Sequence, residues 1–147
     1  MKKPITAVSS ALAIKTAVVE TTNLEGLALD WAVAKAVGIS LDPEPRVFKG
    51  APCVMHATYR ALPYKPFWPT SDWNQAGELV DAHIKRMGDC GEPIAGWDAV
   101  PEGKQYFAIA HNGELATGAT KRIAVCRAVV LAKLGDAVEV PAELVAQ

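Results

Sequence analysis

The residues best suited to chemistry form a short basic run in the segment ATGATKRIAV. Hydroxyl, glycine and basic residues follow one another there: Thr117, Gly118, Thr120, Lys121 and Arg122. If this run opens a helix, free N–H groups point outward and the helix dipole disfavours each cation by about 0.3–1 kcal/mol. A bound anion such as a phosphate would turn that penalty into an attraction. We therefore expect either an anion-binding site or a solvated helix start with two exposed basic side chains.

This run is not a P-loop, because it lacks the GxxxxGK[ST] motif and no strand is predicted directly before it. A second candidate site lies in KPFWPTSDWNQAGEL. Helical spacing places Trp73 with the core, whereas Trp68 precedes a helix cap and could line a cleft. Asp72, Asn74 and Gln75 follow, and their polar groups beside an aromatic ring could bind a ligand. A capped helix start needs the same residue types, so both interpretations stay open.

The chain has no recognisable catalytic set: GxSxG, HExxH and paired-cysteine motifs are missing from the sequence. Its three cysteines, Cys53, Cys90 and Cys126, are widely spaced, as is typical of reduced thiols. Cys126 falls on an apolar helical stripe and is expected to be a buried small hydrophobe. We predict no catalytic residue, no metal and no cofactor.

Three helices are expected to position these residues, over 24–37, 72–87 and 118–134. Asn23 is the expected N-cap of the first helix, and Gly38 is expected to end it. Two apolar stripes on that helix predict that it is covered on more than one side. The expected apolar face of the second helix follows i, i+3 and i+4 spacing: Trp73, Ala76, Gly77, Val80, Ile84 and Met87.

Strands are expected at 105–111 and at 137–141. Six prolines within 38–70 exclude a continuous central strand, although 47–48 and 53–59 could form short ones. We predict one α+β domain over 1–147, with three helices packed on a small, mostly antiparallel sheet and long proline-rich loops. Residues 1–13 are expected to be a loosely ordered extension. Trp97, in an irregular stretch, could line a site or the core.

Composition excludes several classes of protein. The formal net charge is −1, so the basic surface typical of DNA-binding proteins is not expected. The sequence contains no run of about 20 apolar residues that could cross a bilayer. We expect a protein of the bacterial cytoplasm.

Three segments resemble the phage NinX-like family: LEGLALDWAVAKAVG (24–38), WPTSDWNQAGELV (68–80) and the stretch 116–144. They occur in the family's order and cover about two fifths of the chain. LDWAVAK and WPTSDW are the most distinctive. The resemblance implies an accessory protein of tailed phages or prophages, and it supplies no characterised catalytic motif.

From these features we expect a protein that binds a small anionic ligand, such as a nucleotide, without transforming it. Such a protein could counter a host defence signal. One alternative is an interaction module that binds a host or phage protein, and a weaker one is an enzyme acting on nucleotides. Broad apolar helical faces also make a homodimer or higher homo-oligomer plausible.

Overall fold

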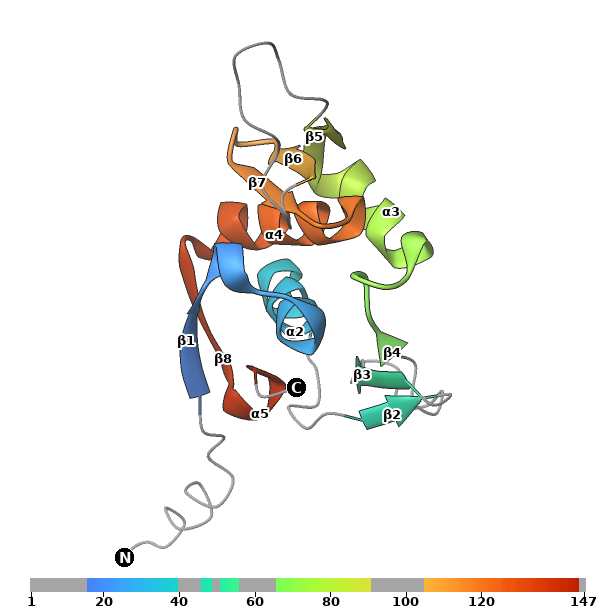
Figure 1. Cartoon of the computed structure of the whole chain (residues 1–147), viewed down its shortest axis with the longest axis vertical. Coiled ribbons are helices and arrows are strands. Elements are labelled where there is room, and N and C mark those ends of the chain that lie inside the picture. Colours follow the sequence, from blue (N-terminus) through green and yellow to red (C-terminus); the bar gives the residue numbers. More distant parts are fainter. Residues whose placement is uncertain (1–15, 40–45, 49–50, 56–65, 91–104, 146–147) are drawn as a thin grey trace, which may run out of the picture.

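Three long helices and three small antiparallel sheets make up the part of the chain that the computed structural model describes, residues 16–39, 46–48, 51–55, 66–90 and 105–145. The central elements are α2 (Gly26–Val37), α3 (Trp73–His83), β5 (Ile84–Asp89), β6 (Tyr106–Ala110), β7 (Leu115–Gly118) and α4 (Lys121–Leu134). Strands β5, β6 and β7 form a sheet on one side of α4, while α2 packs on the other side (Figure 1). The predicted α+β class is confirmed.

Two smaller sheets border this centre. The first pairs β1 (Thr16–Glu20) with β8 (Ala137–Pro141), which confirms the expected strand at 137–141. The second contains β2 (Arg46–Phe48), β3 (Ala51–Met55) and β4 (Pro66–Phe67). The short turn η1 (Thr21–Asn23) and the short helix α5 (Ala142–Val145) complete the described elements. The predicted extension over 1–13, most of the proline-rich loops and Trp97 lie outside the described residues.

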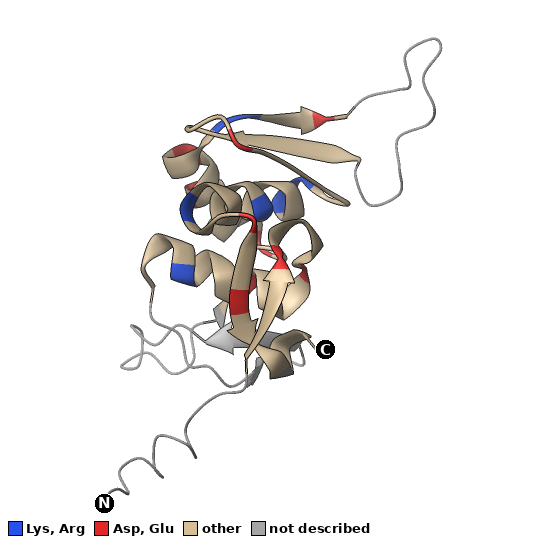
Figure 2. Cartoon of the chain, turned by 90° about the vertical axis from the view of Figure 1, so that its left-hand side faces the viewer, with Lys and Arg blue, Asp and Glu red and all other residues tan. Residues whose placement is uncertain are grey.

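Helix α4 runs through the middle of the protein, and its residues from Ala124 to Val130 are all buried. Thr120 is its N-cap, because the Thr120 hydroxyl oxygen accepts the Ile123 N–H at 3.1 Å. The helix begins later than predicted because the preceding residues pair with β6 as β7. The expectation that no strand precedes this helix is therefore wrong. All four charged side chains of α4 are basic and are spread along it (Figure 2): Lys121, Arg122, Arg127 and Lys133.

Arg127 joins three parts of this centre. Its Nε donates to the Leu24 carbonyl oxygen at 2.8 Å, and its Nη1 donates to the Thr117 carbonyl oxygen at 2.9 Å. The side chain is 9% exposed, so these hydrogen bonds replace most of its contact with water. They hold the chain before α2 and the end of β7 against α4.

Helix α2 is buried on several sides, as its two apolar stripes predict. Gly38 ends it with φ 82°, and the N–H of Ile39 reaches back to the Ala34 carbonyl at 2.8 Å. The expected N-cap is wrong, because Asn23 belongs to η1. Glu25 precedes the helix instead, and its side chain makes no capping hydrogen bond.

The second predicted helix ends earlier than expected. Helix α3 stops at His83, and residues from Ile84 onward pair with β6 as β5. The register shifts between Ile84 and Arg86, so an irregularity of β-bulge type interrupts the alternation of sides. Ile84 and Met87, three positions apart, can therefore both pack against the core. A bulged strand thus gives the spacing that the sequence presents as helical.

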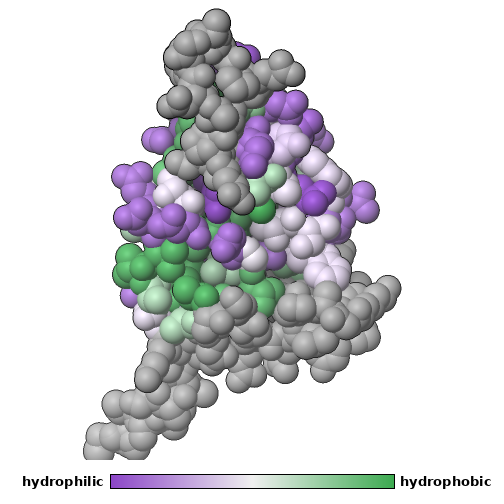
Figure 3. All heavy atoms as spheres, in the orientation of Figure 1, coloured by the Kyte–Doolittle hydropathy of each residue, from purple (hydrophilic) through white to green (hydrophobic). Residues whose placement is uncertain are grey.

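The buried apolar side chains of the described residues form one cluster around α2 and α4. Outside it, Figure 3 shows an apolar area where β1, β8 and α5 lie. Val18 of β1 is 71% exposed and Val145 of α5 is 45% exposed. Val18 stands opposite Glu139 in the β1–β8 pair, so it is a single exposed valine on a face of β1 that also carries charge.

Candidate functional site

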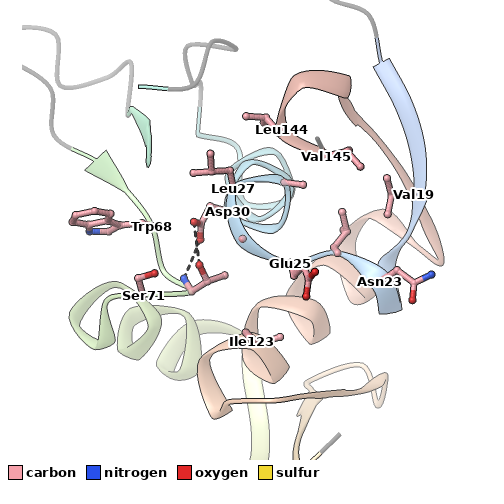
Figure 4. Close-up of a pocket in the computed structure, with 14 residues that line it drawn as sticks. Val19, Asn23, Glu25, Leu27, Asp30, Trp68, Ser71, Ile123, Leu144 and Val145 are labelled. Atoms are coloured by element: carbon pink, nitrogen blue, oxygen red, sulfur yellow. Dashed lines mark hydrogen bonds between the residues drawn. The ribbon is translucent and has the colours of Figure 1, made fainter. Parts of the chain in front are cut away.

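A cavity of about 620 Å³ opens where the start of α2 faces the segment between β4 and α3 (Figure 4). The described lining residues are Val19, Asn23, Leu24, Glu25, Gly26, Leu27, Ala28, Asp30, Trp68, Thr70, Ser71, Ile123, Leu144 and Val145. They come from five elements, β1, η1, α2, α4 and α5, and from the segments beside them. Aliphatic side chains form much of the wall. Two carboxylates and no lysine or arginine occur among these described lining residues.

Asp30 is the most buried charged group of this wall, with 2% exposure. Its Oδ1 accepts the Thr70 N–H at 2.9 Å, and its Oδ2 accepts the Thr70 hydroxyl at 3.1 Å (Figure 4). Burial raises the pKa of Asp30 to about 7, although the two hydrogen bonds from Thr70 oppose the shift. The carboxyl therefore gains and loses its proton close to neutral pH.

Thr70 also contacts α4. The Nε of Arg122 donates to the Thr70 carbonyl oxygen at 3.1 Å, so one residue bridges Asp30 and Arg122. The Arg122 guanidinium lies over the Trp73 ring, 5.3 Å from its centroid, which is a cation–π distance. Asp30, Thr70 and Arg122 thus connect three parts of the fold: helix α2, helix α4, and the segment that precedes α3.

Trp73 does not belong to the core, and the prediction that it packs there is wrong. The side chain is 45% exposed, whereas α3 buries Ala76 and Leu79. Because α3 turns this other face inward, Trp73 lies at the edge of the helix, where Arg122 covers its ring. The predicted apolar face of this helix wrongly includes Trp73 in its first turn and leaves out the buried Leu79.

The four predicted ligand residues around Trp68 have different surroundings. Trp68 lines the cavity, but in Figure 4 its ring lies on the opposite side of its backbone from Asp30. The Oε1 of Gln75 accepts the Trp68 N–H at 2.8 Å. Asp72 is the N-cap of α3 and accepts the N–H of the exposed Asn74 at 3.0 Å. These contacts describe a capped helix start, and of the four residues Trp68 lines the cavity.

The predicted residues at the start of α4 are engaged in protein contacts. The Thr117 carbonyl accepts from Arg127, and the Thr120 hydroxyl oxygen caps the helix. A Cβ on Gly118 would lie 2.8 Å from the backbone nitrogen of Ala124, so this position needs glycine for close packing. The Nζ of Lys121 lies 5.9 Å from the Tyr106 ring centroid, on the side of the β5–β7 sheet. Arg122 joins the two predicted sites, through its bond to Thr70 and its contact with the Trp73 ring.

The sequence interpretation did not select Asp30 or Glu25, which supply the carboxylates of the cavity. One signal was available: a single aspartate stands inside the apolar run GLALDWAVAKAV. A carboxylate in such a run is either paired or functional, because burying an unpaired charge is costly. Nothing in the local pattern identifies Thr70 as its partner, since the two are 40 positions apart.

The described residues form neither a metal site nor a membrane-spanning helix. No group of three histidine, cysteine, aspartate or glutamate residues within the described part of the chain could hold a metal ion. None of the helices among those residues is long and apolar enough to cross a membrane.

Most residues of the candidate site lie in a span that matches a known protein family. A family profile described as Bacteriophage P22, NinX matches residues 20–133, which is more than half of the chain. The matched span contains Asp30, Thr70 and Arg122, so both distinctive segments, LDWAVAK and WPTSDW, meet through the hydrogen bonds between Asp30 and Thr70. No curated protein matches the chain. The chain therefore belongs to the phage family of bacteriophage P22 NinX.

Proposed function

We propose that this phage protein binds a small, mainly apolar ligand in the cavity beside Asp30 and does not transform it. The observation that carries the proposal is the cavity itself. Its volume of about 620 Å³ lies within the range of small-molecule sites, roughly 300–1,000 Å³. Side chains such as Leu27 and Ile123 would contact the apolar body of the ligand.

The polar groups of the cavity restrict the ligand further. Glu25 lines the cavity, and its side chain makes no capping hydrogen bond. Its carboxylate can accept from a hydrogen-bond donor or pair with a positive charge. Two carboxylates in the wall disfavour a phosphate there, and Lys121 and Arg122 already have protein contacts. The preferred ligand is therefore neutral or cationic, in contrast to the anionic ligand expected from the sequence.

A ligand that is bound and not transformed is removed from solution in the infected cell. We propose that the biological role is to sequester a host signal in this way. If the signal is of nucleotide type, its nucleoside part would occupy the cavity. The host cytoplasm is the proposed place of action.

Thermal unfolding tests the ligand proposal. The panel contains neutral aromatic compounds, amines, nucleosides and the corresponding nucleotides. A ligand at 100 times its Kd should stabilise the folded protein by about 2.7 kcal/mol, enough to raise Tm measurably. Valine-to-tryptophan substitutions provide a matched pair, because Val145 lines the cavity and the more exposed Val18 does not.

The expected result is that a neutral or cationic compound raises the Tm of the wild type and of Val18→Trp, but not of Val145→Trp. If only phosphate-bearing compounds raise Tm, or if Val145→Trp responds like the wild type, the cavity is not the binding site. A panel in which no compound raises Tm would overturn the proposal.

A second candidate function is contact with another protein, and the apolar area over β1, β8 and α5 favours it (Figure 3). In the described residues β1 pairs with β8 alone, so its other edge has backbone groups available for a further strand. The partner would be a host or phage protein, or a second copy of this chain as a homodimer.

Lysine substitutions separate this function from ligand binding. Val18→Lys should abolish a stoichiometric complex in a pull-down, or a dimer in sedimentation. Leu115→Lys, at a 53% exposed position on β7, should leave the complex intact. If both variants keep the complex, the surface over β1 is not the interface.

A further inference from the structure

A second, smaller cavity lies at the other end of α4. It has a volume of about 240 Å³, and four of its lining residues can donate hydrogen bonds: His83, His111, Asn112 and Lys133. His83 ends α3, His111 and Asn112 lie in the turn between β6 and β7, and Lys133 lies in the last turn of α4. Ala82, Val129 and Ala132 supply apolar wall.

Hydrogen bonds hold two of these segments next to each other. The N–H of His111 donates to the His83 carbonyl at 3.0 Å, which joins the turn to the end of α3. Within the turn, the Asn112 Oδ1 accepts the Glu114 N–H at 3.1 Å. The Nδ2 of Asn112 has no partner among the described residues and remains available as a donor.

The titratable side chains that line this cavity are all basic. Burial lowers the pKa of His83, and the charges of Lys133 and His111 lower it further. No carboxylate is among the groups that act on His83. The neighbouring Asp81 and Glu114 are exposed, as are His111, Asn112 and Lys133, whereas His83 is half-buried. None of His83, His111 and Lys133 forms an ion pair within the described part of the chain. The fold thus brings together three basic groups, two of which disfavour the protonation of His83.

The helix dipole explains part of this arrangement. Cations are favoured at helix C-termini, which accounts for Lys133 on α4 and for His83 on α3 taken singly. It does not account for the convergence of both with His111 from a turn, because Lys133 and His111 disfavour the protonation of His83. A bound anion would oppose that repulsion and favour the protonated form of His83.

We propose that this cavity binds an oxyanion, either inorganic phosphate or the phosphoryl group of a monoester. His83, His111 and Lys133 supply charge-assisted hydrogen bonds, and the Asn112 amide supplies a neutral donor. The volume holds a phosphoryl group and a small adjoining part of a ligand, and it falls below the usual range for a whole drug-sized molecule.

This site is independent of the cavity beside Asp30. Ile123 lines that cavity, and Val129, Ala132 and Lys133 line this one, so the nearest α4 positions of the two cavities are six apart. At 1.5 Å per residue these positions lie about 9 Å apart along the helix. The two sites also differ in charge, since carboxylates line one and basic groups line the other.

Histidine titration by NMR tests the proposal on the full chain. The ring resonances are followed against pH in sodium phosphate and in sodium chloride of equal ionic strength. The variant His83→Gln assigns the His83 resonance. Bound phosphate should raise the pKa of His83 in a saturable way and shift the ring resonances of His111, and its affinity should increase as His83 becomes protonated.

Variants identify the residues responsible. Lys133→Gln should weaken phosphate binding about tenfold or more, because a charge-assisted hydrogen bond is lost. Lys85→Gln, at an exposed position of β5, should bind phosphate like the wild type. A parallel titration with glycerol phosphate distinguishes the two sources: tighter binding than inorganic phosphate indicates a monoester, and equal or weaker binding indicates free phosphate.

Two results would overturn the proposal. One is a pKa of His83 that is the same in phosphate and in chloride. The other is an equal response of Lys133→Gln and Lys85→Gln, since the phosphate effect would then not depend on this cavity. The wild-type comparison stands without any variant, so a folding defect in a variant cannot hide the answer.

Discussion

Replacing Asp30 by asparagine should change how the stability of this protein depends on pH. Burial raises the pKa of the Asp30 carboxyl from 3.8 to about 7. Between these pH values the folded protein retains a proton that the unfolded chain has released, so the free energy of unfolding falls as pH rises. Above about pH 7 the carboxyl is ionised in both states, and the full cost of the buried charge is present.

The size of the effect follows from the shift. A rise from 3.8 to about 7 is about three pKa units, which corresponds to an upper limit of about 4 kcal/mol at about 1.4 kcal/mol per unit. An asparagine can keep both contacts with Thr70, since its oxygen accepts the N–H and its amide donates to the hydroxyl oxygen. The variant therefore removes the charge while leaving the hydrogen bonds at 2.9 and 3.1 Å in place.

Urea unfolding from about pH 4 to about pH 8 measures the difference between the two proteins. The free energy of unfolding of Asp30→Asn, relative to the wild type, should rise by about 1–4 kcal/mol across this range. His83 acts in the opposite direction, because its pKa is lowered, but it is present in both proteins and cancels in the difference. Parallel pH profiles for the two proteins would refute the reasoning, since Asp30 would then titrate alike in the folded and unfolded chain.

Three further predictions concern packing and burial. Gly118→Ala should destabilise the protein by about 1–3 kcal/mol, because its Cβ would lie 2.6 Å from the Ile123 Cγ2. A Cβ on Gly77 would have no neighbour within 4 Å, so Gly77→Ala should stabilise α3 by about 0.5–1 kcal/mol. Equal changes of the free energy of unfolding in urea for the two glycine variants would contradict this contrast. Arg127→Met should cost about 1–3 kcal/mol by the same assay, because two carbonyl oxygens lose their donors, whereas Lys85→Met should change little. In a Cys53→Ser variant, maleimide should label the exposed Cys90 rapidly and the buried Cys126 slowly, because burial also raises the pKa of Cys126. Equal labelling rates of the two cysteines in mass spectrometry would contradict this prediction.

Several features of the fold follow from local sequence alone. Gly38 and Gly135 mark the ends of α2 and α4, because glycine adopts the positive φ angles of 82° and 94° found there. Cys126 lies on an apolar stripe and is buried as expected. These properties depend on residues within one or two turns of each other, and a pattern read along the chain contains them.

The predictions that the structure contradicts fail for a different reason. Ile84 and Met87 are spaced like residues of a helix, yet they lie on an irregular strand that pairs with β6. Pairing partners lie far along the chain, and a shift in register changes which side chains share a face. Helical spacing predicts Trp73 in the core, whereas the packing of α3 against α4 leaves Trp73 at the edge of the helix, beside Arg122.

The sequence by itself determined the family, the α+β class and the positions of the main helices, because motifs and apolar periodicity are properties of neighbouring residues. Tertiary structure alone decided the candidate sites. The hydrogen bonds between Asp30 and Thr70, and the cluster of His83, His111 and Lys133, join segments that are distant in the chain. Burial and mutual charge set the pKa values of Asp30 and His83, and both exist only once these segments have packed together.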